Sequence, residues 1–115
     1  MVRNTRTISW VKAAWKDFLD FPKDAQDKAA TALTFVAEGG KPDSAKPLTG
    51  LGSGVWEIAI KSRGDAYRVV YALQFGEDIW VVHVFQKKSK QGIATPKPEI
   101  DLVRERIKRL KEQMR

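Results

Sequence analysis

The chain has 115 residues, of which 43% are apolar and 30% are charged, with no cysteine and one histidine. These values are ordinary for a globular protein with one core and argue against a disordered chain. The lack of cysteine excludes disulfides and thiolate chemistry, and a single imidazole argues against a zinc site. We therefore expect one domain, residues 1–115, that uses no metal and no small-molecule cofactor.

The charge of the sequence is positive and unevenly distributed. The net charge is +7, which favours polyanionic partners because each phosphate bound by Lys or Arg releases condensed counterions. Residues 85–98 contain four lysines and no acidic residue. No stretch reaches the roughly 18 apolar residues of a membrane span, and the N-terminus lacks the apolar run of a signal peptide. We expect a cytoplasmic protein without membrane contact.

The first forty residues predict a short strand and two helices. Residues 5–10 alternate polar and apolar side chains, as a strand does. An amphipathic helical stripe follows, formed by Val11, Ala14, Trp15, Phe18 and Leu19. After Pro22 a second, alanine-rich stripe runs to Val36 and ends at Gly39-Gly40. We expect the two helices to form a hairpin.

Residues 41–54 are rich in Gly, Pro and Ser and predict a loop, with a short extended piece around Leu48 to Leu51. Its sequence GLGSG, residues 50–54, invites comparison with a phosphate-binding loop. No Gly-Lys-Ser/Thr motif and no helix follow it, however. We interpret it as a turn between strands.

Two alternating runs, residues 55–61 and 66–75, predict an antiparallel hairpin. Arg63-Gly64-Asp65 supplies the tight turn that joins them, and a two-residue turn at Gly64-Asp65 would set Lys61 opposite Arg68.

The remaining sequence predicts a third strand and a helix. Residues 79–86 complete a meander, and the face on which His83 lies stays open because the register is not fixed. Thr95 is expected to cap a C-terminal helix that Pro96 opens. The helix has an apolar stripe for packing on the sheet, formed by Ile100, Val103, Ile107, Leu110 and Met114. Its basic side either contacts a polyanion or is solvated, and we favour solvent.

Arg68 lies within an apolar run, AYRVVYAL, where a charge needs a partner. Either it forms an ion pair with Glu57 or Asp65, or it binds phosphate. Both roles are compatible, because a carboxylate can hold one edge of a guanidinium while the other donors contact phosphate. Glu57, predicted on the same face, is our candidate for orienting it.

His83, in VVHVF, is either a core residue with satisfied hydrogen bonds or an acid–base group. The chain lacks the second histidine of a two-imidazole ribonuclease. Proton transfer therefore falls to His83, to a carboxylate, or to a lysine whose pKa is depressed by neighbouring ammonium groups.

Three stretches together resemble a known family: KPLTGLGSGVWEI (residues 46–58), GDAYRVVY (64–71) and HVFQKKSKQGIATPKPEI (83–100). They are similar to the RelE/ParE superfamily of toxins from type II toxin–antitoxin systems, and most similar to its HigB-like, phage-derived branch. The resemblance extends over residues 8–110. It implies an α+β fold in which an N-terminal helical hairpin packs on a twisted, mainly antiparallel sheet, with a C-terminal helix and a basic cleft on the opposite face.

The resemblance also implies an activity and partners. RelE-like members are endoribonucleases that cut mRNA in the ribosomal A site, and a cognate antitoxin, in this branch usually a helix-turn-helix protein, neutralises them. Two alternatives stay open. One is a ParE-like inhibitor of DNA gyrase without nuclease activity, and the other is a non-enzymatic, phage-derived regulatory binding protein.

The resemblance and the residues together give an expected site. The expected catalytic residues are Arg68, Lys61, Lys87, Lys88 and His83, the expected RNA contacts are Arg63, Lys90 and Lys97, and Glu57 is the expected orienting residue. Some RelE enzymes carry a tyrosine near the C-terminus as a proposed base. No tyrosine follows Tyr71 here, so the base stays open.

Overall fold

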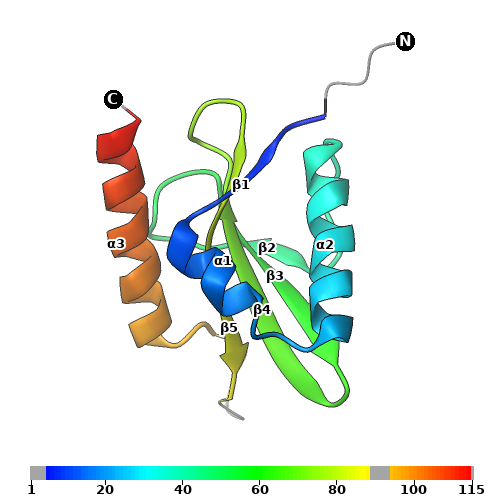
Figure 1. Ribbon diagram of the computed structural model, residues 1–115. Coiled ribbons are helices and arrows are strands. Elements are labelled where there is room, and N and C mark those ends of the chain that lie inside the picture. Colours follow the sequence, from blue (N-terminus) through cyan, green and yellow to red (C-terminus); the bar gives the residue numbers. More distant parts are fainter. Residues whose placement is uncertain (1–4, 89–93, 115) are drawn as a thin grey trace.

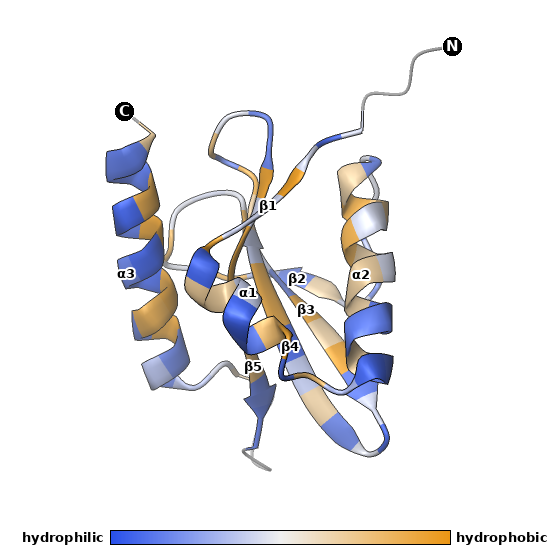
Figure 2. Ribbon diagram, viewed as in Figure 1, coloured by the Kyte–Doolittle hydropathy of each residue, from blue (hydrophilic) through white to orange (hydrophobic). Residues whose placement is uncertain are grey.

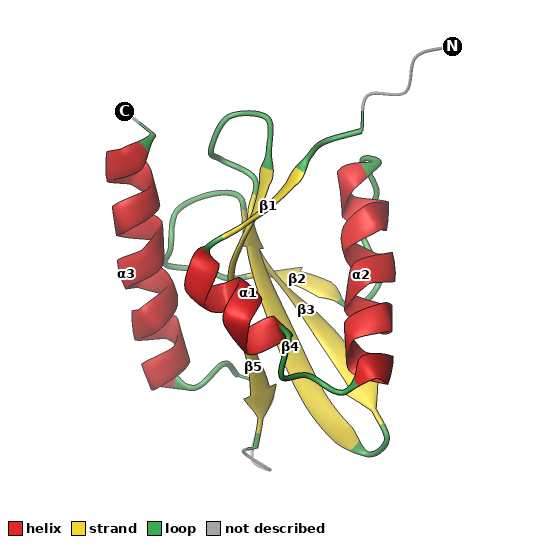
Figure 3. Cartoon of the chain, in the orientation of Figure 1, coloured by secondary structure: helices red, strands yellow, loops and turns green. Residues whose placement is uncertain are grey.

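The computed structural model describes residues 5–88 and 94–114, and this part of the chain forms three helices and five strands (Figures 1 and 3). In chain order the elements are β1 (Ile8–Trp10), α1 (Lys12–Phe18), α2 (Lys23–Ala37), β2 (Ala45–Pro47), β3 (Val55–Ser62), β4 (Asp65–Ala72), β5 (Ile79–Lys87) and α3 (Lys97–Gln113). None of the described helices has the length and apolar content needed to cross a membrane. The expected α+β class is confirmed.

The strands form one sheet in the order β1-β5-β4-β3-β2. The β1 strand runs parallel to β5, whereas the other three pairs of neighbours are antiparallel. One face packs against α1 and α2 and the other against α3. Figure 1 shows the strands between α3 on the left and α2 on the right, with α1 in front. In Figure 2 the apolar side of α3 is turned toward the sheet.

The side chains of β3 and β4 alternate between the two helical layers, as the sequence pattern predicted. Ile58 and Val69 belong to the core beneath α1 and α2. Val55 and Val70 belong to the core beneath α3. Because successive residues of a strand point to opposite faces, Glu57 lies on the α3 side.

The turn between β3 and β4 lies one residue earlier than predicted, at Arg63-Gly64. These two residues have φ angles of 52° and 86°, which is the combination of a type I′ turn. Placing Arg63 in this left-handed region costs roughly 1–2 kcal/mol, whereas glycine adopts it without strain. The tight turn expected within Arg63-Gly64-Asp65 is confirmed, but its placement at Gly64-Asp65 was wrong, because the glycine occupies the second central position.

This shift changes the cross-strand pairs. Lys61 lies opposite Ala66, and Arg68 lies opposite Ala59. The predicted pair of Lys61 opposite Arg68 was wrong. Lys61 and Arg68 still lie on the same face of the sheet, but they belong to adjacent cross-strand pairs of that face. The two positive charges are therefore not directly opposite each other, which would be unfavourable.

The register of β5 settles the position of His83. Phe85 lies opposite Arg68 and His83 lies opposite Val70, before a bulge between Val70 and Tyr71. His83 therefore shares the face of Arg68, on the α3 side of the sheet.

The extended piece expected around Leu48 to Leu51 is instead a loop, and the short strand precedes it as β2. Leu48 and Leu51 are buried in the core beneath α3. The backbone N–H of Leu48 donates to the carbonyl of Val55 of β3 at 2.9 Å, so the piece pairs with the sheet at this one residue and then leaves it.

Two predicted helical stripes extend beyond the packed surface. Trp15, Leu19 and Met114 are 44%, 53% and 48% exposed. Trp15 packs one side of its ring against Trp10 and Phe18, at centroid distances of 5.0 and 5.8 Å. The short α1 ends at Phe18, so Leu19 has no helical layer to pack into.

Candidate active site

The predicted cations of the sheet lie together on its α3 side. Lys61 of β3 and Lys87 of β5 both lie opposite Ala66 of β4, so one cross-strand row carries an alanine flanked by two lysines. Arg68 lies in the next row of the same face. We call the surface formed by Lys61, Arg68 and Lys87 the basic face.

Sheet geometry fixes the spacing within the basic face. Neighbouring strands lie about 4.8 Å apart, and residues rise about 3.4 Å along a strand. The Cα atoms of Lys61 and Lys87 are therefore about 10 Å apart, and each is about 8 Å from that of Arg68. Because Ala66 has a short side chain, the space above it is bordered by three long cationic ones. The Nε of Arg68 is turned toward Glu57, which lies one row further from the two lysines.

Arg68 is held by a buried carboxylate. Its Nε lies 3.6 Å from Oε1 of Glu57, and the two side chains are 12% and 1% exposed. Its Nη1 donates to the carbonyl of Tyr67 at 3.3 Å. Within residues 5–88 and 94–114, Nη2 of Arg68 has no hydrogen-bond partner. Either charge buried alone would be strongly destabilising, so the pair neutralises itself while one edge of the guanidinium stays available.

Glu57 is held in turn by Thr95. The hydroxyl of Thr95 donates to Oε2 of Glu57 at 2.6 Å. Thr95 was predicted to cap α3, and this was wrong. The cap position is Pro96, with no side-chain cap bond, and Pro98 in the first turn has no N–H for a cap to bind. The hydroxyl instead fixes a buried carboxylate, which leaves Oε1 facing Arg68.

The other predicted cations differ in their surroundings. Lys88 and Arg63 are exposed, at the end of β5 and in the β3–β4 turn. Lys97 is 84% exposed and its Nζ lies 2.9 Å from Oδ2 of Asp101 on the same helix, so it does not belong to the basic face. Lys90 lies outside the described residues.

His83 is 3% exposed, and both of its ring nitrogens are engaged. Nε2 lies 2.6 Å from Oε1 of Glu99, and Nδ1 lies 3.0 Å from Nη1 of Arg106. An arginine only donates, so Nδ1 accepts and the ring proton lies on Nε2, donating to Glu99. Burial lowers the pKa of His83 below its ordinary value, outweighing the opposite effect of Glu99. A neutral, buried ring with both nitrogens hydrogen-bonded fits a structural core residue better than an acid–base group.

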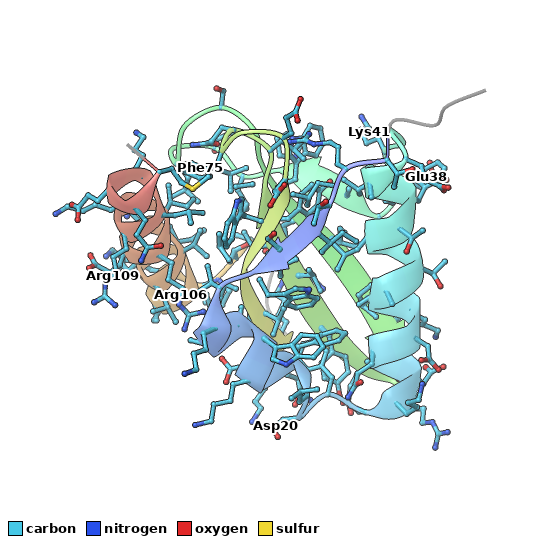
Figure 4. The ribbon with its side chains drawn as sticks, turned by 45° about the horizontal axis from the view of Figure 1, so that its top comes forward. Asp20, Glu38, Lys41, Phe75, Arg106 and Arg109 are labelled. Carbon is cyan, nitrogen blue, oxygen red and sulfur yellow. The ribbon has the colours of Figure 1, made fainter. Side chains whose placement is uncertain are left out.

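Two residues near the site, Arg106 and Lys46, had no predicted role. Arg106 also donates to the carbonyl of Val82 at 3.0 Å, and Figure 4 shows it on α3 beside α1. It follows Val103 by three residues and precedes Leu110 by four, so its helical spacing was the signal that it faces the sheet. Lys46 lies opposite Glu57. It was missed because the strand that carries it was predicted too late in the chain.

The arrangement suits the stabilisation of negative charge. Preorganised cations around one open position lower the energy of a transition state in which charge develops on phosphoryl oxygens. Across the described ranges, no three His, Cys, Asp or Glu side chains are grouped so that they could hold a metal ion.

Comparisons with known proteins agree with this fold. The family model for phage-derived proteins of the Gp49-like type, DUF891, matches residues 16–108. No curated protein matches the sequence. The structure is similar to that of an arginine-to-alanine double mutant of the E. coli toxin RelE in the free state. The TM-score is 0.65 at 17% identity, over 91% of this chain and 97% of that one. The RelE-like architecture implied by the three quoted stretches is confirmed.

Proposed function

The chain belongs to the family of phage-derived Gp49-like proteins, and we propose that it is the toxin of a type II toxin–antitoxin system. In this proposal it is a metal-independent, ribosome-dependent endoribonuclease that cleaves mRNA in the A site and inhibits translation. The observation that carries the proposal is the basic face, where Lys61 and Lys87 flank Ala66 beside an arginine held by buried Glu57.

The proposed reaction is an internal transfer of the phosphodiester. The 2′-oxygen of the ribose bonds to phosphorus while the bond from phosphorus to the 5′-oxygen breaks, leaving a 2′,3′-cyclic phosphate and a 5′-hydroxyl end. A base accepts the proton of the 2′-hydroxyl, and an acid protonates the departing 5′-oxygen. Arg68 with Lys61 or Lys87 contacts the non-bridging oxygens, each donor lowering the barrier by about 3–4 kcal/mol.

The remaining roles follow from exposure and contacts. Exposed Lys88, next to Lys87, is the proposed proton carrier. Buried His83 instead ties β5 to α3 through Glu99 and Arg106. Arg63 contacts RNA outside the scissile position.

The proposed partners are a cognate helix-turn-helix antitoxin and mRNA on the ribosome, in the cytoplasm. Support for the antitoxin is the family membership and the fold shared with a structure described as a toxin.

The decisive experiment is to induce the protein in cells and to map mRNA 5′ ends. Wild type should produce new ends within translated regions, and Arg68→Ala should not. Arg109→Ala is the matched control, because this arginine is 72% exposed on α3 and pairs with Glu105 of the same helix at 3.2 Å. Intact transcripts with DNA damage would instead support a gyrase inhibitor. Intact transcripts and undamaged DNA would support a regulatory binding protein.

A further inference from the structure

A second basic surface lies along α3. Arg104, Lys108 and Lys111 follow one another at intervals of four and three residues, so they share one side of the helix. They line a groove of about 320 Å³ whose opposite wall is the loop segment 50–52. We call it the α3 groove. The glycine-rich loop, which was predicted to be a simple turn, thus faces three cations.

The groove is open and cationic. Gly50 has a φ of 83°, and a Cβ atom there would meet nothing within 4 Å. None of the described residues that line the groove is acidic. Asp101 lies nearby and bonds Arg104 at 3.2 Å, which offsets part of one charge only. A neutral glycine wall facing cations concentrates anions.

Both walls of the groove are reached along the chain from residues that contact or pair with Glu57. β2 carries Lys46 opposite Glu57 and leads directly into the glycine loop. On the other side, Thr95 bonds Glu57, and α3 begins two residues later. Arg104, the first cation of the α3 groove, follows Lys97 by seven residues, which is about 10 Å along the helix axis. The groove therefore lies further along α3 from the pair of Glu57 and Arg68.

We propose that the α3 groove binds the phosphate backbone of the RNA substrate on one side of the scissile phosphate, an inference that rests on the proposed nuclease function. Arg104 to Lys111 spans about 10 Å of helix axis, which is long enough for the cations to contact more than one phosphate of a single strand. Leu51 and Ile107 are the apolar lining residues, and an acidic protein segment would need larger aromatic anchors for stable docking.

The test replaces the two exposed lysines, as Lys108→Ser with Lys111→Ser, and measures RNA binding by fluorescence anisotropy across salt concentrations. The probe is single-stranded 2′-O-methyl RNA, which lacks the 2′-hydroxyl nucleophile and cannot be cleaved by the proposed reaction. Each lost phosphate contact lowers the salt slope by about 0.7. The double variant should therefore show a slope of log affinity against log salt that is shallower by about 1.4.

The matched control is Lys12→Ser with Lys16→Ser on α1, which removes the same charge from exposed positions. Its salt slope should match that of wild type. An unchanged slope in the α3 variant, or an equal change in both variants, would overturn the proposal. Loss of antitoxin binding with unchanged RNA binding would also overturn it and would make the groove a protein-docking site. If mRNA cleavage is mapped in cells but the salt slope of the α3 variant is unchanged, the proposed nuclease function stands and only the proposed role of the α3 groove is wrong.

Discussion

The two faces of the central sheet are equally buried but are built from different chemistry. Ile58 and Glu57 are neighbours in β3 and are 0% and 1% exposed. The first packs among apolar side chains beneath α2, and the second holds a guanidinium and a hydroxyl on the α3 side. The comparison teaches that depth alone does not define the core. Both faces carry an apolar core, and the α3 face also holds buried charges in position within it.

Charges on the α3 face need a reason to be retained. A well-packed apolar pair of similar volume is often as stable as a buried ion pair or more stable. On the α2 face the polar contact at the rim, from Ser62 to Asp24 at 2.7 Å, lies at the end of the strand. On the α3 face, Glu57 and Arg68 lie inside β3 and β4, away from the ends of these strands. We infer that the pair is kept for function.

The largest expected effect on activity comes from replacing the guanidinium of Arg68 with a group of the same charge and different shape. Arg68→Lys should lower the rate of mRNA cleavage by roughly 100-fold or more, because an ammonium cannot both face Glu57 and present a fork of donors to phosphate. Cleavage on programmed ribosomes measures this. Wild-type activity in the lysine variant would contradict a role for the guanidinium geometry.

A substitution on the face beneath α1 and α2 should lower the free energy of unfolding without changing the rate of cleavage by the folded protein. Ile58→Ala should lower the free energy of unfolding by about 2–5 kcal/mol, because it leaves a cavity beneath α2. Urea unfolding measures this loss, and the folded fraction should cleave mRNA at the wild-type rate. A parallel loss of specific activity would show that the two faces are not separable.

Local patterns predicted the elements but not their long-range contacts. Alternation in residues 55–61 and 66–75 placed Glu57 and Arg68 on one face, because strand side chains repeat every two residues. The position of the turn was ambiguous by one residue within Ser-Arg-Gly-Asp. The bond from Thr95 to Glu57 joins residues 38 positions apart. Periodicity carries no information on how α3 docks, so this positioning contact was not predictable.

A smaller loss of activity is expected from changing Thr95, which bonds Glu57 on the α3 face. Thr95→Val keeps the shape but removes the hydroxyl, and a hydrogen bond to a charged group contributes about 1.5–3 kcal/mol. We expect kcat to fall roughly 10-fold with little change in KM, since Glu57 then holds Arg68 less well. Thr95→Ser, which keeps the donor, should restore most of kcat. Equal losses in both variants would point to packing instead.

The smallest effect concerns the imidazole that joins β5 to α3. Burial holds the pKa of His83 below its ordinary value, near 6.5 in an unfolded chain. Below about pH 6.5 the unfolded chain therefore binds more protons, so the free energy of unfolding falls as the pH drops, by at most about 1.4 kcal/mol per pH unit. Above that pH the contribution is constant.

Comparing wild type with His83→Gln isolates this term, because glutamine still donates and accepts but does not titrate. Unfolding in urea between about pH 5 and 8 should show the stability advantage of wild type shrinking only on the acidic side. Glu99, Arg106 and Asp17 act on the ring in both directions. A difference that stays constant across this range would mean that these neighbours cancel the effect of burial, and that the α3 face tolerates a charged imidazole at its centre.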